Sequence, residues 1–119
     1  MLSSSFTVKE SADRLIILLD RLQMAVYARV NRKDESRWWG VVSRPMECIL
    51  FDRPQLSTPI IEKDPILAFY FPMKIIIWED NGCRVAFRDL TTMLRKYDPA
   101  SEIAQWPNLC ADITRALEK

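Results

Sequence analysis

The side chains that could carry acid, base or nucleophilic chemistry in this chain of 119 residues are carboxylates and thiols, because it contains no histidine. Without imidazole, Ser-His and Cys-His nucleophile pairs are excluded, as is the side chain most often used for proton transfer near neutral pH. Asp52, Glu79 or Cys48, with lysine or arginine partners, could still act on a small anionic metabolite. Asp80 follows Glu79 directly, and adjacent residues of a strand point to opposite faces, so these two carboxylates are not expected to share one site.

The same inventory disfavours metal and nucleotide sites. Cys48, Cys83 and Cys110 are far apart and odd in number, and without a CxxC pair or a histidine they do not supply the four ligands of a structural zinc site. They are interpreted as apolar fillers. Gly40 and Gly82 are the only glycines, so neither a P-loop nor a GxGxxG turn can be written. We therefore expect no metal and no cofactor.

Nucleic-acid binding would have to be local, since 17 basic and 16 acidic side chains give a net charge of +1. The basic residues that could hold phosphates beside two tryptophans are Arg29, Arg32, Lys33 and Arg37. Asp34 and Glu35 interrupt this set. Such a mixture is more typical of a solvated helix, with one of Trp38 and Trp39 anchored in the core and the other covering it. Nucleic-acid binding is therefore kept only as a second alternative function.

The chain carries no pattern for export or membrane insertion. Its first six residues lack the charged-then-apolar order of a signal peptide, and no apolar run approaches the roughly 20 residues that span a bilayer. Because no cysteine has an evident partner, we expect a reducing cytoplasm and no membrane.

Hydrophobic periodicity predicts the elements that must position these groups. Thr7 to Glu10 fits a capping box that starts an amphipathic helix. Met24 to Asn31 alternates as a half-buried strand, and a short helix is expected from Asn31 to Trp39, closed by Gly40. Met46 to Phe51 has the length and apolarity of an inner strand.

The second half of the chain is expected to contain a loop, a hairpin and two helices. Pro54 to Pro65 is rich in proline and is predicted as a loop. Apolar runs around Asn81-Gly82 predict a hairpin whose two-residue turn needs positive φ at both positions. Asp89 can cap a short helix, Pro107 can open a final one, and a short strand is expected near Ser4 to Thr7. The apolar set assigned to the final helix is Leu109, Cys110, Ile113 and Leu117.

This order of elements predicts one α+β domain over residues 1–119, with an antiparallel-rich sheet that carries helices mainly on one face. The run that ends in Ile77 and Trp78 is apolar on both faces. One helical layer covers one face, so the other must be covered by the C-terminal helix, the proline-rich connection or a second subunit. A homodimer is therefore predicted.

Four motifs give the chain a family likeness. They are Arg44-Pro45, Phe51-Asp52-Arg53-Pro54, Ser57-Thr58-Pro59, and Phe71-Pro72-Met73-Lys74 through Trp78-Glu79-Asp80. On these motifs the chain resembles the bacterial family called domain of unknown function three-hundred-and-two over about residues 6–99, followed by a C-terminal helix at about 107–118. The resemblance implies a fold similar to the TATA-box-binding-protein-like β-α-β4-α arrangement, frequent dimers and no known activity.

The chain departs from the family pattern at several motif positions and is interpreted as a divergent member. These positions are Asn31, Arg32, Asp52, Arg53, Ser57 and Phe87, where the family often has aspartate-histidine, glycine-asparagine, glycine and tyrosine. Motif residues cluster after the inner strand, where functional groups often sit on a rigid scaffold. We therefore expect a non-enzymatic binding or regulatory module with a small-molecule site at Asp52, Arg53, Pro54, Ser57 and Thr58. Alternatively, Pro54, Thr58 and Pro59 only fix a turn.

Overall fold

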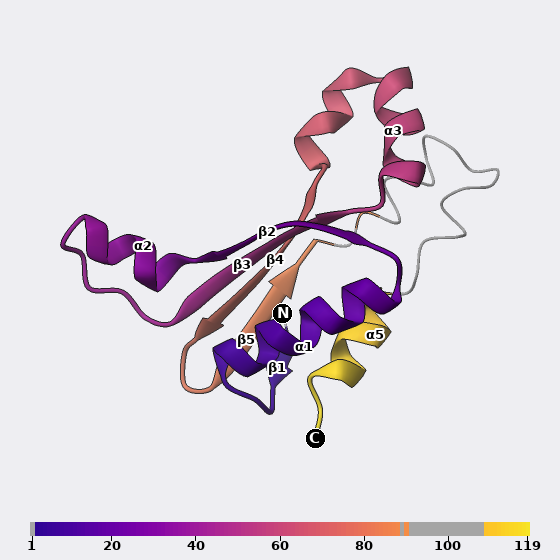
Figure 1. Cartoon of the computed structure of the whole chain (residues 1–119). Coiled ribbons are helices and arrows are strands. Elements are labelled where there is room, and N and C mark those ends of the chain that lie inside the picture. Colours follow the sequence, from indigo (N-terminus) through magenta and orange to yellow (C-terminus); the bar gives the residue numbers. More distant parts are fainter. Residues whose placement is uncertain (1, 89, 91–108) are drawn as a thin grey trace.

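The fold is built on one five-stranded antiparallel sheet in the order β1-β5-β4-β3-β2 (Figure 1). The computed structural model describes residues 2–88, 90 and 109–119. The strands are β1 (Leu2–Ser4), β2 (Ala25–Asn31), β3 (Met46–Asp52), β4 (Met73–Glu79) and β5 (Cys83–Phe87). Because β3 and β4 lie inside the sheet, both faces of these two strands determine how the molecule is covered.

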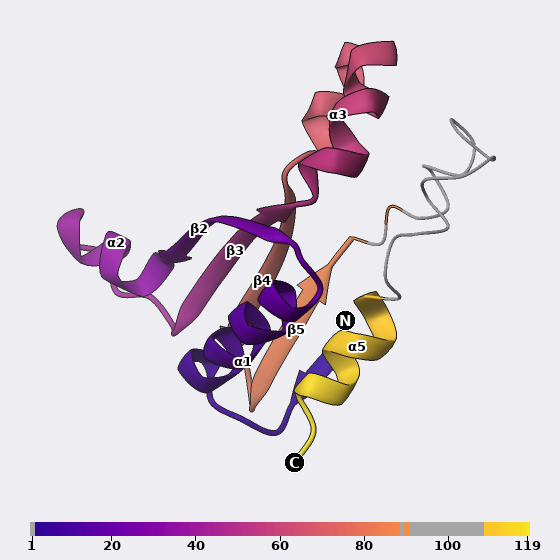
Figure 2. The same cartoon turned by 45° about the vertical axis from the view of Figure 1, so that its right-hand side comes forward.

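Within the described residues, two helices cover one face of the sheet and the others lie at its ends. Figures 1 and 2 show α1 (Val8–Arg21) and α5 (Leu109–Ala116) side by side on the same face. The short helix α2 (Arg32–Trp38) stands at one end, while α3 (Pro54–Lys63) and the 3-10 helix η1 (Pro65–Tyr70) stand at the other. The predicted α+β class, with an antiparallel sheet and helices mainly on one face, is confirmed. The likeness to the TATA-box-binding-protein arrangement stays a prediction.

The helix α1 forms as its sequence indicates and packs one face against the core. The Thr7 hydroxyl accepts a hydrogen bond from the Glu10 amide at 3.2 Å, and the Glu10 carboxylate accepts from the Thr7 amide at 3.3 Å, so the predicted capping box is present. The hydrogen bonds from Thr7 hold the pKa of Glu10 below its usual value. The helix buries one apolar stripe against the inner face of the sheet, made of Val8, Ala12, Leu15 and Leu19 on the helix and Ile49, Phe51, Ile75, Ile77 and Val85 on the strands.

The opposite face of the sheet, which we call the outer face, is apolar at its centre. Antiparallel partners share a face, so the register places Cys48 beside Val30 and Ile76, and Trp78 beside Met46. These side chains are all half-buried. None of the described helices lies on this face (Figure 2). The prediction that the β4 strand is apolar on both faces therefore holds, and within the described residues only one face has a helical cover.

The hairpin between β4 and β5 has the positive φ angles predicted for Asn81 and Gly82, but its turn is longer than predicted. Both residues have positive φ, at 50° for Asn81 and 109° for Gly82. Glu79 pairs with Cys83, so three residues connect the strands, one more than the two that were predicted. Gly40, at φ 67°, follows α2 as predicted, and α2 itself begins where Asn31 accepts a hydrogen bond from the Asp34 amide at 3.0 Å.

The predicted loop after β3 is wrong, because residues Pro54–Lys63 form the helix α3. Pro54 occupies the first turn, where a missing amide hydrogen leaves no helical hydrogen bond unmade. Pro59 lies inside the helix, at a position that usually breaks one. The helix is retained because it buries Leu56 and Ile60, and burial of an apolar face outweighs a single unfavourable propensity.

Three smaller expectations also need correction. Trp38 and Trp39 are 87% and 84% exposed, so neither is anchored in the core: α2 projects from the end of the sheet and has no buried residues. Cys110 is exposed and Leu109 only half-buried, whereas Ile113 and Leu117 are buried as expected, because α5 turns only its Ile113 side to the sheet. The first strand ends at Ser4, before the range predicted for it. The short helix predicted after Asp89 lies outside the described residues, and so does Pro107, which was predicted to open the final helix.

Hydrogen bonds connect the first and the last segments of the chain that the structure describes. The Ser5 amide donates to the Leu117 carbonyl at 2.9 Å, and Arg14 of α1 donates to the Ala116 carbonyl at 2.6 Å. These hydrogen bonds fix α5 beside α1 and β1 (Figure 1). Within the described residues, none of the helices combines the length and the apolar character that crossing a bilayer requires.

Candidate functional site

The predicted site lies at the junction of β3 and α3, where Asp52 and Ser57 bind each other. Asp52 is 4% exposed, and one of its oxygens accepts a hydrogen bond from the Ser57 hydroxyl at 2.7 Å. Its other oxygen accepts from the Arg53 amide at 2.7 Å. Ser57 is itself buried, and Pro54 opens the helix between them. Both carboxylate oxygens are thus engaged by groups of the same helical turn.

The electrostatics of Asp52 reflect this burial. Removal from water raises the pKa of the Asp52 carboxyl, and the hydrogen bonds from Ser57 and from the Arg53 amide oppose that rise. Tyr27 on the neighbouring strand also has a raised pKa, first because its own phenol is desolvated and second because the Asp52 charge is near. The Asp52 carboxylate is thus bound within its own turn, next to the start of α3. The alternative that Pro54, Thr58 and Pro59 only fix a turn stays a prediction.

The other residues of the predicted site diverge from this pair. Arg53 reaches toward Gln23, with 3.5 Å between its guanidinium nitrogen and the amide oxygen. Thr58 is exposed on the helix surface. The five residues are therefore neighbours along one turn, but Asp52 and Ser57 point at each other while Thr58 faces water. Ligand binding by this set stays a prediction.

The residues of the alternative enzyme are not brought together. Asp52 is the last residue of β3, at one end of the strands, whereas Glu79 lies beyond the pair Met46 and Trp78 at the opposite end. The seven residues of β3 separate these ends by roughly 20 Å at about 3.3 Å per residue. Cys48 is half-buried on the outer face, and Glu79 is exposed beside the hairpin. No single cleft can contain these groups as general acid, base and nucleophile.

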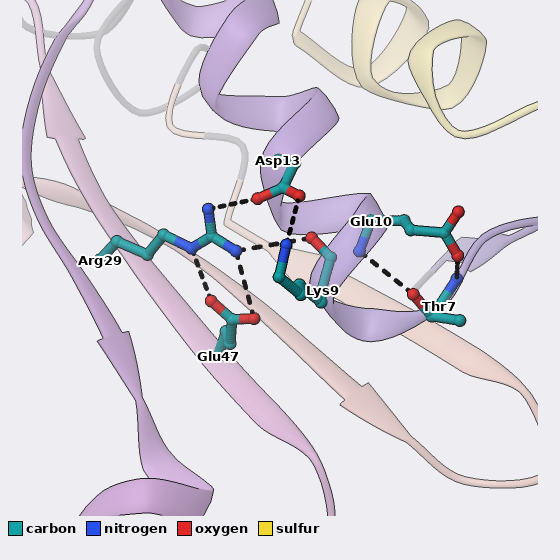
Figure 3. Close-up of polar contacts among 6 residues, drawn as sticks. All are labelled: Thr7, Lys9, Glu10, Asp13, Arg29 and Glu47. Carbon is teal, nitrogen blue, oxygen red and sulfur yellow. Dashed lines mark hydrogen bonds and ion pairs between the residues drawn. The ribbon is translucent and has the colours of Figure 1, made fainter.

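The most buried ionic cluster joins α1 to the sheet (Figure 3). The Arg29 guanidinium donates to both oxygens of Glu47, at 2.6 and 3.3 Å, and to Asp13 at 2.6 Å. The Glu47 side chain is only 7% exposed, while those of Arg29 and Asp13 are 31% and 43% exposed. Hydrogen bonds from Arg29 and then Lys9 hold the pKa of Asp13 below its usual value, and the bond to Glu47 is the main cause that raises the pKa of Arg29.

Three of the four basic residues proposed for nucleic acid, Arg29, Arg32 and Arg37, form such pairs. Arg29 faces the inner side of the sheet under α1. Arg32 pairs with Glu35 at 2.6 Å, and Arg37 lies 3.9 Å from Asp34. The positive charges of this segment are therefore partly neutralised and do not form one continuous surface for phosphates.

A cavity that the sequence did not indicate lies between η1 and the ends of β4 and β5. Its volume is about 560 Å³. Three aromatic side chains line it, together with two basic ones, Lys74 and Arg88. The aromatic residues are Phe69, Tyr70 and Phe87, and the apolar residues Met73, Ile76 and Leu90 complete much of the wall. No residue of the Asp52 to Thr58 site takes part in this lining.

Part of the signal for this cavity was present in the sequence. Lys74 belongs to the motif Phe71-Pro72-Met73-Lys74, and Phe87 is a position at which the chain departs from the family pattern. These two residues lie on different strands, β4 and β5, and the aromatic wall comes from η1. Because η1 begins where the predicted loop ends and no element was predicted for Ile66 to Tyr70, their convergence could not be read from the sequence.

The fold and its sites define the class of this protein: a small α+β domain with a five-stranded antiparallel sheet and helices on one face. Residues 2–119 match the family model described as "Domain of unknown function DUF302", and the chain belongs to that family. The resemblance read from the motifs is thereby confirmed. The family description names no activity, so the chain is an uncharacterised domain at this level.

Comparison with curated proteins gives remote relatives of much greater length. The chain is 26% identical over 82 residues to "Fluoride-specific ion channel FluC 1" of Brucella suis biovar 1 (strain 1330), which covers 69% of this chain and 32% of that protein. The protein of the same name from Brucella abortus biovar 1 (strain 9-941) is also 26% identical over 82 residues, 30% of its length. The chain thus spans about a third of the curated relatives it matches.

A solved structure shares the fold. It is described as "Crystal structure of uncharacterized conserved protein DUF302 from Bacillus stearothermophilus", with a TM-score of 0.68 and 20% sequence identity. The match covers 98% of this chain and 89% of that one. This likeness supports the α+β architecture over nearly the whole chain and carries no statement about function.

Proposed function

We propose that this chain is a non-enzymatic binding or regulatory module that works as a homodimer, with the outer face of its sheet as the interface. The observation that carries the proposal is the apolar centre of that face, where Cys48 is flanked by Val30 and Ile76. Trp78 and Met46 extend the same surface, and aromatic and methionine side chains are enriched in protein interfaces. A second copy would remove this apolar surface from water, as α1 and α5 do on the inner face.

The non-enzymatic part of the proposal is supported by the state of the carboxylates. Both oxygens of Asp52 accept hydrogen bonds from its own helical turn, and those of Glu47 accept from Arg29. A general base must reach the proton that it abstracts, whereas Asp52 and Glu47 are buried and face groups of the protein. These two buried carboxylates instead fix the helix start and hold α1 on the sheet.

Three further parts of the proposal concern the extent of the domain, its cellular compartment and its role. We propose a single domain over residues 1–119 and a reducing cytoplasm, which the unpaired thiols of Cys48, Cys83 and Cys110 favour. A regulatory or binding role also agrees with the lengths of the relatives. In the proteins named as fluoride-specific ion channels, the matched segment is joined to twice its own length of other sequence.

The dimer is tested by sedimentation equilibrium at micromolar concentration. We expect a mass of about twice the 13.9 kDa chain for the wild type. The variant Cys48→Glu places a charge at the centre of the outer face and should sediment as a monomer. The matched control is Ile17→Glu, which makes a similar change at a residue of α1 that is 54% exposed and away from the outer face; it should stay dimeric. A monomeric wild type, or a dimeric Cys48→Glu, contradicts the proposal.

A further inference from the structure

We infer that the cavity between η1 and the ends of β4 and β5 binds a small aromatic carboxylate. The inference specifies the ligand of the proposed binding module, but it does not require the dimer. Its residues come from two stretches that are distant in sequence: the end of η1 and the start of β4, with Phe69 and Lys74, and the end of β5 with the residues directly after it, including Arg88. The fold therefore brings together two cations and an aromatic wall that no single motif contains.

The size and walls of the cavity suit an organic molecule. A volume of about 560 Å³ falls in the range of roughly 300–1,000 Å³ typical of small-molecule sites. The rings of Tyr70 and Phe87 and the apolar side chain of Met73 provide surfaces against which a flat apolar body can be buried. Phe69 lines the same cavity yet is 86% exposed, so its ring has most of its surface available to cover a ligand.

The charges of the cavity select an anion. Among the described residues that line it, Lys74 and Arg88 are basic and none is acidic. Neither cation forms an ion pair with an acidic side chain in the part of the chain that the structure describes. The guanidinium carbon of Arg88 lies 5.9 Å from the centroid of the Tyr70 ring, which keeps the charge beside the aromatic wall. An anionic group on the ligand would satisfy both cations.

A carboxylate fits this arrangement better than a phosphate group. Phosphate sites commonly use backbone amides of glycine-rich turns, and neither Gly40 nor Gly82 lines the cavity. Arginine instead recognises a planar carboxylate through paired hydrogen bonds, and lysine adds a point charge. In such a ligand the planar carboxylate would face Lys74 and Arg88, and the aromatic body would lie against the rings of the cavity wall.

The probe for this site is 2-naphthoate, with 2-naphthalenemethanol as its uncharged counterpart. Isothermal titration of the full chain should show saturable binding of 2-naphthoate at concentrations of about 1 mM or below. The alcohol should bind at least about tenfold more weakly, because it lacks the charge-assisted hydrogen bonds to Lys74 and Arg88. Absence of saturation with 2-naphthoate, or equal affinity for both compounds, overturns the inference.

Variants assign the binding to the cavity. Lys74→Gln and Arg88→Gln should each weaken binding of 2-naphthoate by about tenfold, since each removes one charged partner. Both residues are exposed, so the fold should be retained, which circular dichroism checks. Lys63→Gln is the matched control, because Lys63 is exposed on α3 and does not line the cavity, and it should bind as the wild type does. Equal weakening by all three variants would mean unspecific charge attraction and refute the site.

Sedimentation of the same samples separates this inference from the proposed dimer. A monomer that binds 2-naphthoate with the expected variant pattern refutes only the dimer. A dimer that fails to bind refutes only the cavity assignment. Amide chemical-shift changes should centre on Phe69 to Ile76 and Ala86 to Arg88, and changes confined to another part of the chain also refute the site.

Discussion

Replacement of Arg29 by methionine removes the only cation that contacts the Glu47 carboxylate among the described hydrogen bonds and ion pairs. The Glu47 side chain is 7% exposed, so its charge would remain buried without a partner. Breaking a fully buried ion pair costs about 3–5 kcal/mol. Arg29 is 31% exposed, which allows water to approach the site, so we expect a loss of about 2–3 kcal/mol in the free energy of unfolding.

The second substitution in this experiment is Glu47→Met. Because the double variant Arg29→Met/Glu47→Met carries no buried charge, it should recover much of the loss, with a coupling energy of at least about 1 kcal/mol. Urea unfolding followed by circular dichroism gives the four free energies of the cycle. Lys9→Met is a control, since it removes only the pair with Asp13 on the helix surface and should barely move the midpoint.

The pH dependence of the same variants gives an independent check. The lowered pKa of Asp13 contributes stability that is present above its unfolded value and is lost as pH falls through the folded value. Arg29→Met removes the largest cause of that shift, so stability should fall less steeply with acid in the variant than in the wild type. If Arg29→Met is as stable as the wild type, or if Glu47→Met does not restore the loss, the ionic cluster does not hold α1 on the sheet.

Two further predictions concern Asp52 and the exposed tryptophans. Because burial raises the pKa of Asp52, the wild type should lose stability relative to Asp52→Asn as pH rises from about 3.9 through the folded value; a wild-type urea midpoint that rises relative to that of Asp52→Asn over this range would contradict this. Trp38→Ala and Trp39→Ala should each change the free energy of unfolding by less than about 0.5 kcal/mol, because both side chains are more than four-fifths exposed. A loss above about 2 kcal/mol for either variant in urea unfolding would show that its ring is buried in solution.

The elements that were correctly predicted are those with local signals. The capping box at Thr7 fixes the start of α1, and Asn31 and Gly40 mark the two ends of α2, because caps act through neighbouring backbone groups. The positive φ of Asn81 and Gly82 is likewise a local requirement. The apolar character of both faces of β4 was evident from its composition, since alternate residues of a strand divide between two faces.

The elements that were missed depend on contacts between distant segments. The proline content of α3 indicates a loop, and only burial of Leu56 and Ile60 against the rest of the fold reverses that preference. The cavity could not be predicted because Phe69, Lys74 and Arg88 meet only after η1, β4 and β5 are in place. The site predicted at Asp52 depended on motif clustering, which could not indicate the bond between Asp52 and Ser57, and ligand binding at this site stays a prediction.

The hydrogen bond between Ser5 and Leu117 has a consequence for how this unit can be joined to other proteins. It places the end of β1 and the end of α5 side by side at one edge of the sheet (Figure 1). A domain with adjacent ends can be inserted into a loop of another protein without forcing that loop apart, and it tolerates circular permutation. The exposed segment around Gly40, remote from the inner-face core, offers a place for new ends. The same connection that fixes α5 thus makes the domain easy to combine with unrelated sequence.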